Sequence, residues 1–352
     1  MRIIAVMLRS FSLSFIALLL LCCLPGCKHK THVVNRGFYY WKTTYAPTAY
    51  EQHTLQQLKV QTMYIRLFDV DMNQAIRQPY PVAAVRLPAA MDKAFRYVPV
   101  IFITQRTLKL LDKDNIPQTA ARINNLAYAL CTAAGITPAE LQIDCDWTAG
   151  TRQTYFSLLT ALRKQDFFAG KTLSCTIRMH QIKYTGSSGI PPADKGLLMC
   201  YNMGNMKKPG EHNSILETAT AKQYLSGIGS YPLPLDIALP IFSWSLLFHG
   251  QEFGSILRDV PAALLVQNPL FRKRSANIYE CRRDTIWQGH LLRTHDVIRV
   301  EESDPETQEE IAAYTAARIK NDSLNVIFFS CDSITLSKYP LHELETVYHH
   351  YQ

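Results

Sequence analysis

Two acidic residues near the middle of the chain carry its clearest chemical signal. They lie in the run Leu-Gln-Ile-Asp-Cys-Asp-Trp-Thr, residues 141–148. Because the side chains of a strand alternate between its faces, Asp144 and Asp146 share one face with the neutral polar residues of the run. The other face is apolar, which suits packing against helices. Two neighbouring carboxylates repel each other, so we expect coupled and shifted pKa values. A solvated edge strand is the alternative interpretation.

Runs rich in β-branched and aromatic residues recur along the chain, and helical patterns lie between most of them. Such short runs, often apolar on both faces, are typical of parallel strands covered by helices. Eight strands are predicted, at residues 38–43, 62–69, 98–104, 141–148, 172–179, 196–202, 235–244 and 325–331. The clearest helices are predicted at residues 48–59, 119–134, 151–165, 214–226 and 305–320. We therefore predict an α/β fold, a (β/α)8 barrel, with functional residues at the carboxyl ends of its strands. An open doubly wound sheet is the alternative, but no glycine-rich turn follows the first strand.

One stretch does not fit a simple barrel. Two strand-like runs, at residues 277–282 and 291–301, precede the helix that leads to the last strand. We interpret them as a β-hairpin inserted between strands 7 and 8, with the insertion at about residues 273–302 of a barrel spanning residues 37–352. This stretch also contains the basic clusters Arg272-Lys273-Arg274 and Arg282-Arg283. They are either solvated surface or a contact for anionic polymer or lipid headgroups.

The first 26 residues have the pattern of a signal peptide. Arg2 and Arg9 precede an apolar run at residues 11–24, which is short for a membrane span. The run ends in Leu-Pro-Gly-Cys, which resembles the bacterial lipobox, and this resemblance implies lipidation of Cys27. Residues 27–36 would then be a lipidated tether. No acidic cluster follows Cys27, which favours a cell-envelope protein anchored in the outer membrane and facing the periplasm.

Composition excludes several classes of protein. Hydrophobic residues make up 47% of the 352-residue chain and charged residues 19%, a globular profile. The net charge of +8 is spread along the sequence, so we expect no nucleic-acid partner. There is no zinc-type CxxC pair, Walker loop, GxGxxG or HExxH motif, so no metal site and no cofactor are expected. Cys281 and Cys331 are the most plausible disulfide pair, although buried free thiols are commoner in apolar runs.

Three strands together resemble motifs of family 18 glycoside hydrolases, the chitinase-like barrels. Residues 141–148 are similar to the family's fourth-strand DGxDxDxE, with Asp144 and Asp146 on its last two Asp. Thr148 falls on the catalytic Glu of that motif. Residues 198–202 resemble the sixth-strand Met-x-Tyr-Asp, with Asn in place of Asp, and residues 237–244 resemble the seventh-strand Gly-x-Pro-x-Tyr.

The resemblance implies a mechanism that this chain departs from. In the family, the Glu protonates the leaving oxygen while the N-acetyl group of the substrate attacks the anomeric carbon. The hydroxyl of Thr148 does not act as an acid near neutral pH. We therefore expect a lipoprotein whose barrel binds a carbohydrate without normal family 18 hydrolysis.

The residues expected at this carbohydrate site come from several strands. The candidates for ligand contact are Trp41, Arg66, Arg178, Tyr201, Asn202 and Trp244. Arg178 has a structural alternative, an ion pair with an inward Asp. A first alternative function is a glycoside hydrolase in which Asp69 or Asp71 has become the acid. A second is a scaffold for other envelope proteins. The partners expected are a glycan and the membrane that holds the lipid.

Overall fold

Eight parallel strands pair in sequence and close into a barrel in the computed structural model, which describes residues 31–257 and 260–352. Pairing of β1 with both β2 and β16 completes the closure. The barrel strands are β1 (Val33–Tyr40), β2 (Thr62–Asn73), β4 (Arg96–Ile103), β5 (Glu140–Cys145), β6 (Thr172–Arg178), β7 (Lys195–Met199), β8 (Leu235–Pro240) and β16 (Ser323–Phe329). The predicted (β/α)8 barrel is confirmed. The predicted signal peptide and Cys27 lie outside the described residues.

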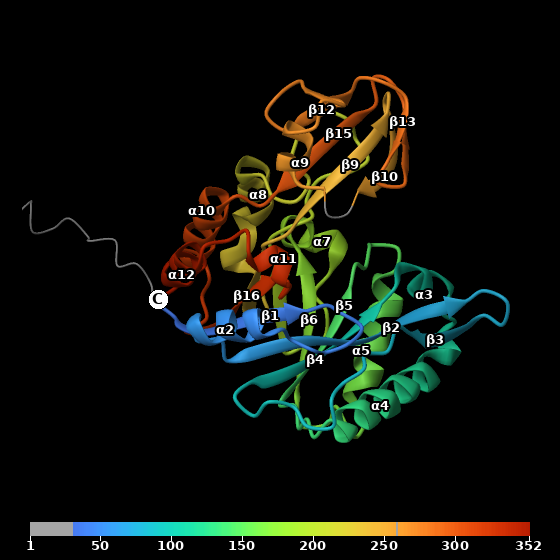
Figure 1. Ribbon diagram of the computed structural model, residues 1–352. Helices are drawn as coiled ribbons and strands as arrows, with labels where there is room; N and C mark the ends of the chain where they lie inside the picture. The colour runs from blue at the N-terminus through green and yellow to red at the C-terminus, as the bar shows by residue number, and fades with distance from the viewer. Residues whose placement is uncertain (1–30, 258–259) are drawn as a thin grey trace, which may run out of the picture. The chain divides into compact units, whose positions relative to one another are not determined.

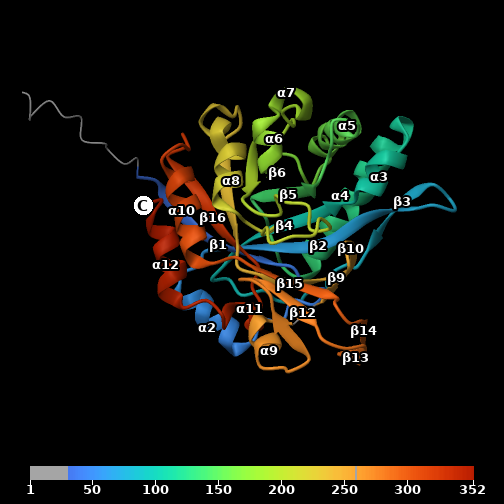
Figure 2. The ribbon, with the colours of Figure 1, turned by 90° about the horizontal axis from the view of Figure 1, so that it is seen from above.

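Helices surround the strands, as Figure 2 shows. The helices that follow barrel strands are α2 (Ala49–Gln57), α3 (Gln105–Leu110), α4 (Ile116–Ala133), α5 (Arg152–Arg163), α6 (Met179–Lys183), α7 (Thr185–Ser188), α8 (Thr218–Tyr224), α10 (Pro305–Ala316), α11 (Ser333–Leu336) and α12 (Leu341–His349). Local chemistry sets where they begin. Asp304 caps α10 by accepting a hydrogen bond from the Thr307 N–H at 2.8 Å, and Pro305 takes the first position. None of the described helices has the length and apolar character that crossing a membrane requires.

The barrel begins earlier in the chain than predicted. β1 starts at Val33 rather than at residue 37, so its first half is strand and not tether. This half carries polar residues that find partners far along the chain. Arg36 donates to the Leu58 carbonyl at 3.0 Å and forms an ion pair with Glu345 at 2.6 Å. Because Asn35 and Arg36 are polar, the sequence has no long apolar run there to indicate a strand.

The insertion is larger than the predicted hairpin. It begins at Ser243 and forms a five-stranded antiparallel sheet in the order β10-β9-β15-β12-β11 (Figure 1). Its strands are β9 (Ser243–His249), β10 (Glu252–Leu257), β11 (Phe271–Lys273), β12 (Ile278–Cys281) and β15 (Val297–Glu302), with a separate hairpin of β13 (Thr285–Trp287) and β14 (His290–Leu292) and the short helix α9 (Ala262–Val266). The run at residues 235–244 is nearly continuously apolar, so the sequence does not indicate the boundary between β8 and β9. A single strand was therefore predicted there.

The barrel and the insertion have separate hydrophobic cores. In the insertion, Leu247, Tyr279 and Ile298 belong to a core of their own. The predicted pairing of Cys281 with Cys331 is wrong, because Cys281 lies in this second core and Cys331 in the barrel core. All six cysteines in the described residues are free and buried. Residues from His32 to Gln352 form one structural unit.

Candidate functional site

Asp144, Asp146 and Arg178 meet where β5 and β6 end. β5 pairs with β4 on one side and β6 on the other, which excludes a solvated edge strand. Asp144 is 4% exposed and accepts a hydrogen bond from the Thr176 hydroxyl at 2.7 Å. Asp146 follows the end of β5 and forms an ion pair with the Nε of Arg178. Asp146 is therefore the carboxylate that pairs directly with Arg178, while Asp144 is hydrogen-bonded to Thr176.

Burial controls the electrostatics of this group. It raises the pKa of Asp144 to about 6, with a further contribution from the charge of Asp146, while Arg178 acts in the opposite direction. Burial also disfavours the Arg178 cation, but Asp146 and Asp144 outweigh this effect and raise the pKa of the guanidinium. The charge of Asp146 thus contributes to the raised pKa of Asp144, and the charge of Arg178 partly offsets that contribution.

Asp144→Asn is expected to stabilise the protein at neutral pH. Between the ordinary pKa of an Asp near 4 and the value of about 6, the folded chain binds a proton that the unfolded chain does not, so stability falls as pH rises through this window. Asn removes that unfavourable charge, so the free energy of unfolding at pH 7.5 should rise by about 1–3 kcal/mol. Urea unfolding measures it.

The same comparison at pH 4 should show a much smaller difference, because Asp144 is then protonated in the folded chain and about half protonated in the unfolded chain. Asp166→Asn, on the exposed surface, is the control for the change in net charge. A destabilised Asp144→Asn at pH 7.5 would contradict the expectation.

The other carboxylates predicted as site residues are already engaged. Asp69 forms an ion pair with Arg66, whose Nε lies 2.6 Å from the carboxylate. Asp71 accepts from the Thr104 hydroxyl at 2.8 Å and pairs with Arg106 at 3.0 Å. Both lie within β2, which is longer than predicted and turns back as β3 (Gln78–Val82). A carboxylate in an ion pair has no proton to donate, so neither suits the role of acid.

Thr148 lies beyond the end of β5 and is exposed. Its backbone N–H donates to the Thr151 hydroxyl oxygen at 2.9 Å, and the two hydroxyls lie 3.3 Å apart. These contacts shape the turn that leads into α5. The next residue back, Trp147, points away from the barrel interior, because it stacks on Tyr155 with ring centroids 5.0 Å apart.

Aromatic rings from four strand ends form a connected cluster at this mouth. The ring of Phe329 lies 5.7 Å from Trp41, 5.6 Å from Tyr201 and 5.8 Å from Phe242, centroid to centroid. Phe242 and Phe329 were not predicted as site residues. The available signal was their position, because each lies within the last three residues of a predicted strand, as Trp41 and Tyr201 do. The cluster gives the mouth an apolar floor.

Two polar atoms beside this floor lack partners. The Tyr201 hydroxyl and the Nη1 of Arg178 are buried and have no hydrogen-bond partner among the described residues. Burial raises the pKa of Tyr201 well above its usual value, and the nearby charge of Arg178 opposes the rise. A buried donor without a partner is unfavourable, and an acceptor on a ligand relieves this. Tyr201 and Arg178 therefore define a place for a ligand oxygen.

The other three residues predicted to contact a ligand, Arg66, Asn202 and Trp244, lie in different surroundings. Arg66 is close, with its guanidinium 5.8 Å from the centroid of the Trp41 ring. Asn202 is exposed, has a positive φ of 54°, and its backbone N–H donates to Ile215 at 2.8 Å. Trp244 belongs to β9 of the insertion, and its Nε1 donates to Glu301 at 2.8 Å. Its polar edge is thus already used within the protein.

A buried ion pair fastens the loop after β7 to the insertion. Arg299 and Glu301 of β15 have fully buried side chains and lie 2.6 Å apart. Arg299 also donates to the carbonyls of Met206, Lys208 and Gly210 at 2.6–3.0 Å. Glu301 accepts from the backbone N–H of Ser214 at 3.0 Å and from Trp244. Alternation places both residues on one face of β15, but nothing in the sequence indicates these distant partners.

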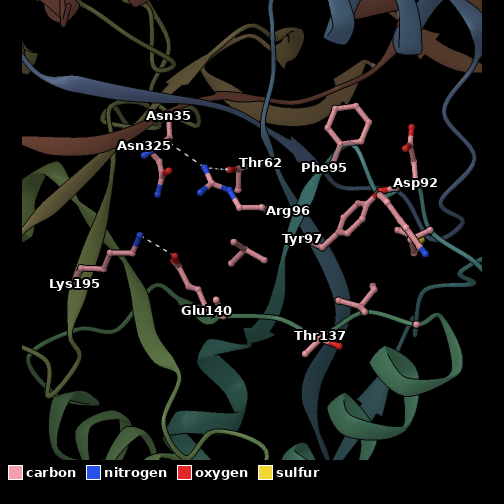
Figure 3. Close-up of a pocket in the computed structure, with 16 residues that line it drawn as sticks. Asn35, Thr62, Asp92, Phe95, Arg96, Tyr97, Thr137, Glu140, Lys195 and Asn325 are labelled. Atoms are coloured by element: carbon pink, nitrogen blue, oxygen red, sulfur yellow. Dashed lines mark hydrogen bonds and ion pairs between the residues drawn. The ribbon is translucent and has the colours of Figure 1, made fainter.

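A pocket of about 490 Å³ lies at the opposite end of the barrel, where the strands begin. Figure 3 shows Lys195 directed at Glu140, and Arg96 at Asn35 and Thr62. Lys195 lies 2.8 Å from Glu140 and 2.6 Å from Asp236, so its charge is compensated within the protein. These polar groups are paired with one another, in contrast to the unpartnered Tyr201 hydroxyl and Arg178 Nη1 at the mouth.

The fold and its mouth define a class: a (β/α)8 barrel with paired carboxylates and exposed loops at the carboxyl ends of its strands. Comparison with solved structures shows which known proteins have a similar fold. A chitinase from Chromobacterium violaceum is 11% identical with a TM-score of 0.54 over 90% of this chain and 98% of that one. The spore cortex-lytic enzyme SleL of Bacillus cereus is 12% identical with a TM-score of 0.51, covering 91% and 75%.

A third solved structure carries a bound ligand. Catalytic domain 2 of an Ostrinia furnacalis Group II chitinase, as a mutant in complex with the chitooligosaccharide (NAG)5, is 11% identical with a TM-score of 0.52, covering 90% and 96%. No protein-family model and no curated protein sequence matches the chain. The chain has the fold of a divergent chitinase-like TIM barrel, as the strand motifs predicted.

Proposed function

We propose that the mouth of the barrel binds an N-acetylated glycan without hydrolysing it. The observation that carries the proposal is the pair of buried, unpartnered donors on Arg178 and Tyr201, beside an aromatic floor. An acetamido carbonyl supplies the oxygen that these donors lack, and aromatic faces suit the apolar faces of sugar rings. The Ostrinia furnacalis domain, which has the same fold, holds an oligosaccharide of this class.

The proposed absence of hydrolysis follows from the lack of a residue that can act as the general acid. In the motif resemblance Thr148 falls on the Glu, and its hydroxyl oxygen lies 3.3 Å from that of Thr151. Asp69 and Asp71 are held in ion pairs with arginines, so no relocated acid is available from β2. Loss of a general acid typically lowers a rate by about 10²–10⁴-fold. Binding therefore remains as the activity that the mouth supports.

A glycan array probed with the chain from Lys28 onward, followed by titration with N-acetylchitooligosaccharides, tests this proposal. Tyr201→Phe removes only the unpartnered hydroxyl and should weaken binding about tenfold, since it removes one hydrogen bond to the ligand. Tyr231→Phe is a matched control, because its hydroxyl is also buried and unpartnered but lies in the loop that precedes β8. Its binding should equal that of the wild type.

Two results would count against the proposal. Equal binding by wild type and Tyr201→Phe would remove Tyr201 from the site. Release of new reducing ends by the wild-type protein would show that a hydrolytic acid exists after all. In that case Asp146→Asn, which would abolish turnover in the hydrolase alternative, identifies the carboxylate involved.

We also propose that the chain is a lipoprotein, anchored through Cys27 in the outer membrane and facing the periplasm. The basic start, the short apolar run and the lipobox-like Leu-Pro-Gly-Cys support this. Labelled palmitate should be incorporated by the wild type and not by Cys27→Ala. Equal label on both proteins would refute the anchor.

A further inference from the structure

The hairpin of β13 and β14 presents two apolar side chains to solvent. Ile286 and Leu291 face each other directly across the strands and are 74% and 58% exposed. The turn between the strands is Gln288-Gly289, with φ values of 49° and 78°, which is the type I′ geometry that joins strands tightly. Two large apolar residues on one face of a narrow hairpin are unfavourable in water unless they contact something.

The opposite face of the hairpin holds it in place. The Trp287 ring packs on Phe271 with centroids 4.9 Å apart, and Leu292 is fully buried in the insertion core. At the base, Asp284 accepts two hydrogen bonds from Thr294, both at 2.7 Å. Ile286 and Leu291 therefore lie on a hairpin that is held in place by its packing on the insertion core. Little conformational entropy is lost when they contact a partner.

The surroundings of the hairpin are basic. Residues 271–295 contain six Lys or Arg against two Asp or Glu, a net charge of +4. Arg272 and Arg274 are paired with Glu280. Arg282 and Arg283, next to the first strand of the hairpin, are exposed and form no ion pair within the described part of the chain. Free arginines beside an apolar pair suit a partner with phosphate groups and an apolar interior.

We propose that this hairpin, with Arg282 and Arg283, docks on the surface of an anionic lipid bilayer. Ile286 and Leu291 enter the boundary between headgroups and acyl chains, and the arginines contact lipid phosphates. A polysaccharide offers no apolar layer for the exposed pair. A stable protein interface buries about 800 Å² on each partner, far more than two side chains supply. This inference is independent of the glycan site.

Vesicle co-sedimentation tests the proposal with the chain from Lys28 onward, which contains the whole barrel and insertion. Phosphatidylethanolamine vesicles with about one third phosphatidylglycerol should bind the protein, and phosphatidylcholine vesicles should not. Salt at about 0.5 M should release it. Ile286→Ser with Leu291→Ser, and separately Arg282→Glu with Arg283→Glu, should each lower the partition coefficient about tenfold or more.

Matched variants separate this surface from general effects. Ile76→Ser with Val266→Ser removes two apolar side chains of similar exposure, 64% and 63%, and should not change binding. Lys109→Glu with Lys164→Glu repeats the change in net charge on α3 and after α5. Failure of wild type to bind the phosphatidylglycerol vesicles, or equal loss in these controls, would overturn the proposal. A dimer in solution that Ile286→Ser with Leu291→Ser dissolves would instead assign the hairpin to a second copy of the chain.

Discussion

Thr148→Glu is expected to create glycoside hydrolase activity in a protein that we propose has little or none. The substitution restores a carboxyl two residues after Asp146, at the place where the chitinase-like motif has its acid. Repulsion from Asp146 favours the protonated form of the new carboxyl, as a general acid requires. Hydrolysis of N-acetylchitooligosaccharides, measured as reducing ends, should rise by at least about 10²-fold over the wild type.

Thr148→Gln is the control for this experiment. Its side chain has the size of the Glu variant and lacks the acidic proton, so it should show no gain. Adding Asp146→Asn to Thr148→Glu should remove the gain, because Asp146 is the carboxylate expected to steer the acetamido group. Full activity in Thr148→Gln would contradict an acid role for this position. No activity in Thr148→Glu, with binding retained, would contradict the alignment of residues 141–148 with the motif.

Arg299→Met is expected to destabilise the protein by about 3–5 kcal/mol. The variant retains an apolar stem but leaves Glu301 buried without its cation and removes the donors to three carbonyls of the loop after β7. An uncompensated buried charge is strongly unfavourable, unlike the loss of an exposed ion pair. Urea unfolding monitored by circular dichroism gives the free energy.

Arg274→Met provides the comparison for Arg299→Met. Arg274 also pairs with a Glu of the insertion, but its side chain is 50% exposed, so its loss should lower stability by less than about 1 kcal/mol. Similar losses in the two variants would show that burial of the Arg299–Glu301 pair has no special weight. Protease cutting of residues 203–217 in the Arg299 variant alone would confirm that the pair holds this loop.

The barrel could be predicted because its signals are local. Each strand is a short apolar run, and each helix between strands carries its own pattern or cap, as at Asp304. Alternation along residues 141–148 correctly separated the inward Asp144 from the outward Trp147, since that rule needs no knowledge of distant partners. The motif resemblance then identified the fold of the whole barrel.

The residues that were missed depend on contacts between distant segments. Val33 to Arg36 is strand because β16 and Glu345 lie beside it, some 290 to 310 residues later. Trp244 was assigned to the mouth, but its partner Glu301 comes from β15. The pairing of Asp71 with Arg106 likewise became visible only when β2 and α3 were placed. Asp69 and Arg66 lie only three residues apart on β2, so their ion pair is a local contact that was also missed. A sequence shows which groups are charged, and the fold shows which of them are already neutralised.

For the six buried thiols, folding of the protein competes with oxidation. Burial raises the pKa of each of them, in the case of Cys131 to about 12. At pH 7 a thiol of that pKa is ionised in only about one molecule in 10⁵, and the thiolate is the form that attacks a disulfide. In the exported protein that we propose, an oxidant finds nucleophilic sulfur only on chains that have not yet folded. Whether the thiols remain reduced is then decided by the rate of barrel closure relative to the rate of oxidation.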